Sequence, residues 1–187
     1  FAGVPKVLVY YDRRQLAQHE MDLQRSVSVV SEIEIRPTLD MILTQNPGTK
    51  RVMVVTGDQP GDRRWSDLAE KDLAPYADRI EVEQTGGLAM DDLRLKLAAL
   101  PANTVILFIS PPRDSSGNSL NMAEGATLIS PSANAPVYSI VDTTMGYGVL
   151  GGQMLSFESM GIRAAEVGQR ILAGEEPKNI PQQDVPT

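Results

Sequence analysis

Three segments that follow one another decide the fold: Pro136-Val-Tyr-Ser-Ile-Val141, Gly146-Tyr-Gly-Val-Leu-Gly-Gly152 and Ser156-Phe-Glu-Ser-Met-Gly-Ile-Arg-Ala-Ala165. They predict a strand, a glycine-rich turn and a helix. Ser156 suits the N-cap, because its hydroxyl can accept a hydrogen bond from a free amide of the first turn. Gly174 is typical of a helix end. Apolar residues recur in this helix at steps of three and four, so one face is expected to pack against another element.

The composition limits the class of protein. The chain has 187 residues, enough for one domain with a full core or for two small lobes, and its net charge is -7. This acidic balance argues against nucleic acid as a partner, because phosphate binding needs a basic face. The absence of cysteine excludes thiol catalysis and disulfides. No apolar run approaches the roughly 20 residues that span a bilayer, so a membrane anchor would belong to a longer parent chain.

Strands and helices alternate regularly from residue 37 onward. Each expected strand is largely apolar and is followed by a helical pattern, an alternation typical of a parallel sheet with helices on both faces. The sequence therefore predicts an α/β fold with a doubly wound parallel sheet. The expected strands cover 51–56, 79–84, 104–109 and 137–141, and the expected helices begin at Pro37 and cover 65–77, 90–100 and 123–132.

The two ends of the chain are less regular. The β-rich runs 5–11 and 26–30 are expected to be short strands, although the second could be a crossover segment. Apolar positions in the polar stretch 13–24 predict a surface helix. The final segment 177–187 contains three prolines and few apolar residues, so we expect a tail or a linker there.

Small and acidic residues follow the expected strands. The carboxyl ends of parallel strands form the crevice where such sheets bind ligands. Short hydroxyl side chains, glycines and carboxylates suit a small polar solute held by hydrogen bonds. Each residue alone is also explained by capping or turn chemistry, so the hypothesis depends on the whole set. The candidate ligand-binding residues are Thr56, Gly57, Asp58, Ser110, Asp114, Asp142, Met145 and Gly146.

An enzyme is the alternative from another class. The motif Gly146-x-Gly148-x-x-Gly151 follows a strand, as in dinucleotide-binding proteins. However, that motif turns directly into a helix and needs an acidic residue about 20 positions on, and both features are missing here. An NAD-dependent activity is therefore disfavoured, and no cofactor is expected.

A hydrolytic or metal-dependent mechanism also lacks its residues. His19 is the single histidine and lies in a polar segment far from the expected strand ends, which disfavours a Ser-His-Asp triad. The pairs Asp58 with Asp62 and Asp91 with Asp92 are explained as a loop and a helix start, where negative charge is favourable. We therefore expect no catalytic residue and no metal site.

Several segments together resemble a known family. The resemblance is to the ABC-transporter substrate-binding family with the type I periplasmic-binding fold, and it is closest to the versions that form extracytoplasmic input regions of bacterial sensor histidine kinases. It extends over most of the chain from Pro37. The segments that carry it are Asn46-Pro-Gly-Thr-Lys-Arg-Val-Met-Val-Val55, Pro101-Ala-Asn-Thr-Val-Ile-Leu-Phe108, Ala135-Pro-Val-Tyr-Ser-Ile140, Gly148-Val-Leu-Gly-Gly152, Ser156 to Ala165 and Arg170-Ile-Leu-Ala-Gly-Glu-Glu-Pro177.

The resemblance implies two lobes that close around a small polar solute. Residues 1–30 would then end the N-terminal lobe and cross over, 31–150 would form the C-terminal ligand-binding lobe, and 151–187 would form a return helix and tail. The helix at 156–173 would ordinarily pack against a missing lobe, so a second copy of the chain is another expected partner. Closure would be passed to a kinase domain or, alternatively, to a transporter permease. The expected location is extracytoplasmic, and a membrane anchor in a longer parent chain is compatible with it.

Overall fold

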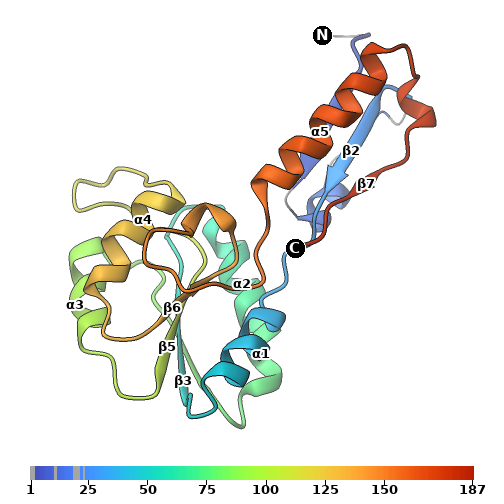
Figure 1. Ribbon diagram of the computed structural model, residues 1–187. Helices are drawn as coiled ribbons and strands as arrows, with labels where there is room; N and C mark the ends of the chain where they lie inside the picture. The colour runs from blue at the N-terminus through green and yellow to red at the C-terminus, as the bar shows by residue number, and fades with distance from the viewer. Residues whose placement is uncertain (1–2, 11, 19–21, 23) are drawn as a thin grey trace. The chain divides into compact units, whose positions relative to one another are not determined.

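The computed structural model describes residues 3–10, 12–18, 22 and 24–187 (Figure 1). The chain divides into two compact units, which are described separately. Unit 1 comprises Phe1–Ile33 and Leu155–Thr187, and unit 2 comprises Glu34–Met154. The chain therefore passes from one unit to the other twice. Within the described residues no helix is long and apolar enough to cross a membrane.

Unit 2 contains a four-stranded parallel sheet, which confirms the predicted α/β fold. Its strands are β3 (Arg51–Val55), β4 (Glu81–Gln84), β5 (Thr104–Phe108) and β6 (Val137–Ser139), in the spatial order β4-β3-β5-β6. All three strand pairs are parallel. The central strand β5 is buried along its whole length, as its continuous apolar sequence predicts.

Helices cover both faces of this sheet. Figure 1 shows α1 and α2 on one face and α3 and α4 on the other. The helix α2 begins three residues earlier than its apolar pattern predicts, and its last turn tightens into a short 3-10 helix, η2 (Ala74–Tyr76). The bounds of the four helices are α1 (Arg36–Gln45), α2 (Asp62–Leu73), α3 (Met90–Ala98) and α4 (Met122–Ile129).

One core cluster of unit 2 lies between the sheet and the helices α3 and α4, and buried apolar residues of α1 and α2 cover the other face. Alternate residues of β3 and β5 pack against one face of each of the helices α3 and α4. Burial of each large apolar side chain contributes about 1.5–3 kcal/mol to the stability of the fold. This core fixes the positions of the strand ends, where the candidate site residues lie. Its fully buried members include Met53, Val55, Met90, Leu93, Leu97, Ile106, Phe108, Ala126 and Ile129.

A hydrogen bond between α1 and η2 makes the stability of unit 2 depend on pH. The Tyr76 hydroxyl donates to Asp40 Oδ1 at 2.5 Å. Partial burial, together with this bond to the carboxylate, raises the pKa of Tyr76 to about 12. The neutral phenol is thus favoured in the folded chain, so its stabilising effect is fully present below pH 10 and is lost as the pH rises toward 12.

An absorbance titration of tyrosinate checks this prediction. The wild-type chain is expected to show an ionisation step near pH 12 while folded, and Tyr76→Phe is expected to lack that step. The urea midpoint of the wild type should also fall more steeply between pH 10 and pH 11.5 than that of the variant. A single ionisation step near pH 10 for all tyrosines would contradict the assignment.

Unit 1 contains a three-stranded parallel sheet covered by one long helix. Its strands are β1 (Lys6–Tyr10), β2 (Ser26–Val30) and β7 (Gln183–Asp184), in the order β1-β2-β7. The helix α5 (Phe157–Leu172) contacts β1 and β2. Its cap is as predicted, because Ser156 Oγ accepts a hydrogen bond from the Ser159 amide at 3.2 Å.

The face of α5 that contains Met160 and Val167 is buried on the chain's own sheet. Unit 1 thus covers the part of the helix that was expected to need a missing lobe or a second copy. Phe157, Ile162 and Leu172 remain exposed on other faces of α5. A dimer formed through this helix stays a proposal.

Two expectations for the chain ends are corrected by unit 1. The segment 177–187 is not a free tail, because it contains β7, and the Val185 amide donates to the Val30 carbonyl oxygen at 2.8 Å. Its buried Ile180 and Val185 provide the apolar anchors. The helix expected over 13–24 is a short 3-10 helix, η1 (Arg13–Gln18), and residues 19–21 and 23, including His19, lie outside the described part of the chain.

Candidate functional site

The order of the strands places a topological switch point between β3 and β5. From β3 the chain moves to β4 on one side, and β5 then pairs with the opposite side of β3. In open parallel sheets this change of direction leaves a crevice outside the carboxyl ends of the two central strands, and ligands bind there. We define the carboxyl edge of unit 2 as the residues that follow its four strands, namely 56–58, 85–86, 110–114 and 140–146.

Gly57 and Ser110 meet at the switch point. The Gly57 amide donates to Ser110 Oγ at 3.1 Å, and both residues are buried. A side chain at position 57 has no space, because a Cβ atom would lie 2.4 Å from Asp62 Oδ2 and 2.5 Å from the Pro111 carbonyl oxygen. Glycine therefore allows the turn after β3 to pack directly against the turn after β5.

Three hydroxyl groups continue the carboxyl edge toward β4. Thr56 Oγ1 and Ser66 Oγ lie 3.1 Å apart, and Thr85 Oγ1 accepts from the Thr56 amide at 3.4 Å. Such hydroxyls can exchange a protein partner for a polar solute, because each both donates and accepts. The candidate set omitted Thr85 and Ser66. Thr85 could have been included from the sequence, because it follows a predicted strand. Ser66 could not, because it lies within α2 and comes close to Thr56 only through the packing of that helix.

The carboxylates of Asp58 and Asp114 already have partners, Asp58 in the loop after β5 and Asp114 in its own loop. Asp58 Oδ1 lies 3.7 Å from Arg113 Nε, and both side chains are about half exposed. Asp114 Oδ1 accepts from the amides of Ser116 at 2.9 Å and Asn118 at 2.7 Å, and Asp114 Oδ2 accepts from Asn118 Nδ2. The side-chain bond from Asn118, followed by the backbone bonds, lowers the pKa of Asp114. A ligand contact through either carboxylate stays a prediction.

Asp142 differs from these carboxylates. Its Oδ1 atom is buried and has no hydrogen-bond partner within the part of the chain that the structure describes, and the same holds for Ser139 Oγ. Burying an acceptor without a donor costs about 1–3 kcal/mol, and more if the group is charged. Buried polar groups are nearly always paired in native proteins, so an unpaired one calls for an explanation. A ligand that carries a donor would satisfy the Asp142 oxygen.

Met145 and Gly146 belong to the same turn as Asp142. The Met145 amide donates to the Asp142 carbonyl oxygen at 2.9 Å, and Gly146 has a φ of 85°, which glycine adopts readily. Met145 is 49% exposed. Since β6 pairs with β5, this turn lies one strand from Ser110. With adjacent strands about 4.8 Å apart, the carboxyl edge extends over roughly 15 Å, a span suited to a small solute.

The glycine-rich segment 146–152 does not form a dinucleotide site. The Leu150 amide donates to the Val137 carbonyl oxygen at 2.8 Å, and the Ser139 amide donates to the Gly151 carbonyl oxygen at 3.0 Å. Through these bonds the segment lies along the side of β6 that does not pair with β5. In a dinucleotide fold the glycines would instead open a helix directly. Among the described residues there is also no group of three or more histidine, aspartate or glutamate side chains that could hold a metal ion.

Solved structures of other proteins share this fold. A ligand-free, open substrate-binding protein with adhesive properties from Clostridium difficile has a TM-score of 0.69 at 15% identity, over 97% of this chain and 61% of its own. An ABC domain in complex with L-Trp from Streptococcus pneumoniae has a TM-score of 0.66 at 14% identity, over 98% and 62%. A conserved domain protein from Vibrio cholerae has a TM-score of 0.59 at 18% identity, over 86% and 53%.

These comparisons establish the fold. The chain has the α/β architecture of substrate-binding proteins, and it spans between about half and three fifths of the three matched chains. No family model and no curated protein matches the sequence.

Proposed function

We propose that this chain is the ligand-binding part of an extracytoplasmic receptor, and that its ligand is a small polar solute with a protonated amine. The observation that carries the proposal is the buried Oδ1 of Asp142 at the carboxyl edge of unit 2, for which the described residues offer no hydrogen-bond partner. A protonated amine is a charged donor, and charge-assisted hydrogen bonds are about twice as strong as neutral ones. The hydroxyls of Thr56 and Ser110 and the amides of the neighbouring turns would hold the remaining polar atoms of the solute.

The neighbours in the structural comparison support a solute of this kind. The pneumococcal protein holds L-Trp, which carries an amino group, and the clostridial protein is described as a substrate-binding protein. Both likenesses extend over nearly all of this chain. The proposal for this chain nevertheless depends on its own carboxyl edge, because fold alone does not define a ligand.

The function of the whole protein is a further step of the proposal. We propose that solute binding favours a closed form of the complete receptor, and that this change is passed to a sensor histidine kinase. The alternative is delivery of the solute to the permease of an ABC transporter, and the description of the pneumococcal protein as an ABC domain favours it. Both roles use the same ligand chemistry and differ in the partner that detects the closed form.

A ligand screen by thermal unfolding tests the proposal. The full chain is heated with each L-amino acid, with small polyamines and with N-acetylated forms of the same amino acids. We expect one or more free amines to raise the Tm in a concentration-dependent way, since a ligand at 100 times its Kd stabilises the folded state by about 2.7 kcal/mol. The N-acetyl forms of amino acids without a basic side chain should have no effect, because their amide nitrogen cannot carry a positive charge.

Two results would contradict this function. If the N-acetyl form stabilised the chain as much as the free amine, the amine would not be needed for binding. If no amine changed the Tm at millimolar concentration, the ligand would not be an amine. Chromatography can show whether the stabilising compound is consumed during incubation. Consumption would favour an enzyme instead.

A further inference from the structure

The edge strand β4 presents an unpaired backbone. The Glu81 amide donates to the Lys50 carbonyl oxygen and the Thr85 amide to the Val54 carbonyl oxygen, so these residues face β3. Successive residues of a strand direct their N–H and C=O groups to opposite sides, so those of Val82 point away from the sheet. Within the described residues no strand pairs with that side of β4. A free strand edge is a template for another extended chain.

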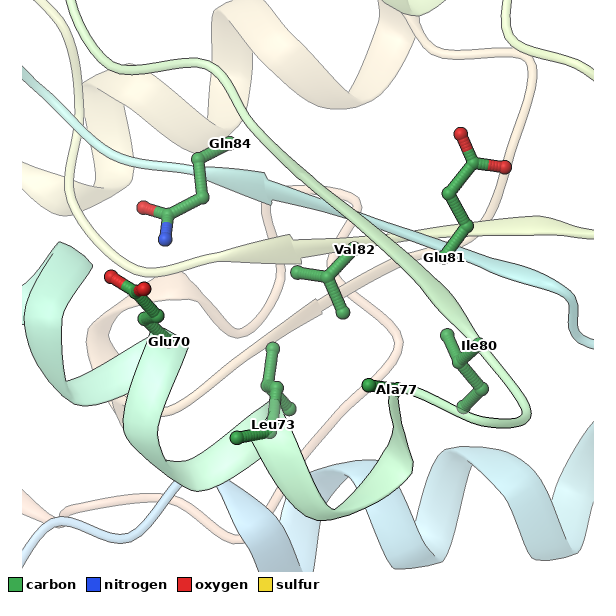
Figure 2. Close-up of a pocket in the computed structure, with 8 residues that line it drawn as sticks. Glu70, Leu73, Ala77, Ile80, Glu81, Val82 and Gln84 are labelled. Carbon is green, nitrogen blue, oxygen red and sulfur yellow. The ribbon is translucent and has the colours of Figure 1, made fainter.

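A groove lies beside this free edge. It has a volume of about 620 Å³ and is formed by β4, the end of α2 and the turn that follows η2. Figure 2 shows Leu73 and Val82 facing each other across it, with Glu70 and Gln84 at one end and Ile80 at the other. The middle of the groove is therefore apolar and could receive the apolar side chains of an added strand.

The opposite face of β4 is acidic. Glu81 and Glu83 alternate with Val82 along the strand. Glu81 is among the residues that line the groove, and Figure 2 shows its carboxylate directed away from Leu73 and Val82. Glu81 pairs with Arg51, and Glu83 pairs with Lys96, yet the two glutamate side chains remain 65% and 53% exposed. A cation on a neighbouring strand could therefore reach either carboxylate, and opposite charges across adjacent strands favour pairing.

We propose that the free edge of β4 binds an extended polypeptide segment in which apolar and basic residues alternate. The segment adds a strand to the sheet, with its apolar side chains in the groove and its basic side chains beside Glu81 and Glu83. Backbone hydrogen bonds to Val82 provide affinity, and the two chemically different faces of β4 select the alternating pattern. The net charge of -7 also favours a basic partner over a second copy of this chain. This interaction is independent of the solute proposed for the carboxyl edge.

Fluorescence anisotropy with a short synthetic peptide of alternating lysine and valine tests the proposal on the full chain. We expect saturable binding, and we expect an affinity at least about tenfold lower for the same peptide N-methylated on every second residue, because N-methylation removes the backbone donors. Val82→Pro should have a similar effect. It removes the outward amide without loss of a bond to β3, and proline is tolerated on edge strands.

The paired variant Glu81→Gln/Glu83→Gln provides a second measurement that does not disturb the backbone. It should lower the affinity for the peptide several-fold and reduce the salt dependence of binding. The matched control Asp91→Asn/Asp92→Asn on α3 should change neither quantity. Equal binding of the N-methylated peptide would overturn strand addition, since only charge would then attract it. Sedimentation showing a dimer that Val82→Pro abolishes would overturn it too, because the occupant would be a second copy.

Discussion

Gly152→Ala is expected to lower the free energy of unfolding by roughly 3 kcal/mol, among the largest effects of any single methyl group in this chain. A Cβ atom at position 152 would lie 1.8 Å from the carbonyl oxygen of Ser139. That oxygen belongs to the backbone of β6, so no side-chain rotation can relieve the overlap. The segment along the side of β6 that does not pair with β5 must instead move away, together with the turn that contains Asp142.

Urea unfolding of Gly152→Ala and of the matched control Gly161→Ala measures this effect. Gly161 lies on an exposed face of α5, and a Cβ atom there would meet nothing within 4 Å. The control should gain about 0.5–1 kcal/mol, because alanine is the better helix former. A Gly152→Ala midpoint within the error of the wild type would show that this segment does not pack against β6 as described.

Asp142→Asn is expected to raise the Kd for the amine-bearing solute by roughly 30-fold or more. Loss of one partner of a buried, hydrogen-bonded charge pair costs about 2–5 kcal/mol, and each 1.4 kcal/mol is a factor of ten in Kd. Asparagine keeps the size of the side chain and removes its charge. Without solute the variant should be at least as stable as the wild type, because a neutral amide is less costly to bury than a carboxylate whose Oδ1 has no partner among the described residues.

These opposite effects distinguish ligand binding from a structural role. Calorimetric titration gives the affinity, and thermal unfolding without solute gives the stability. The control Asp78→Asn should leave the affinity unchanged, because Asp78 is exposed and precedes β4, at the opposite end of the strand from the carboxyl edge. A large loss of stability in Asp142→Asn with an unchanged Kd would mean that Asp142 supports the fold and does not contact the solute.

Most of unit 2 could be predicted from the sequence, because its strands are buried on both faces. Continuous apolar runs such as 104–109 have few alternatives to a central parallel strand, and the regular spacing of helical patterns between them favours a doubly wound sheet. Unit 1 was harder to predict. The strand β7 contains only Gln183 and Asp184, whose polar side chains carry no strand pattern, and it forms because β2 offers a free edge.

The candidate site was predictable only as a set of strand ends. Thr56, Gly57 and Ser110 come together because the strand order places β3 next to β5. Their chemistry could be read from residue type, but the state of each carboxylate could not. Asp114 is bound by its own loop while Asp142 Oδ1 has no described partner, and this difference depends on backbone geometry that residue type does not encode.

Amide chemical-shift mapping tests the central claim that the carboxyl edge of unit 2 binds the solute. Isotope-labelled full chain is titrated with the free amine that raises the Tm most, and the perturbed amides are assigned. The account predicts that the largest shifts fall in 56–58, 85–86, 110 and 142–146, and that Asp142→Asn abolishes them at the same concentration. Largest shifts elsewhere, such as on β4 or α5, with those segments unperturbed at saturation would contradict it.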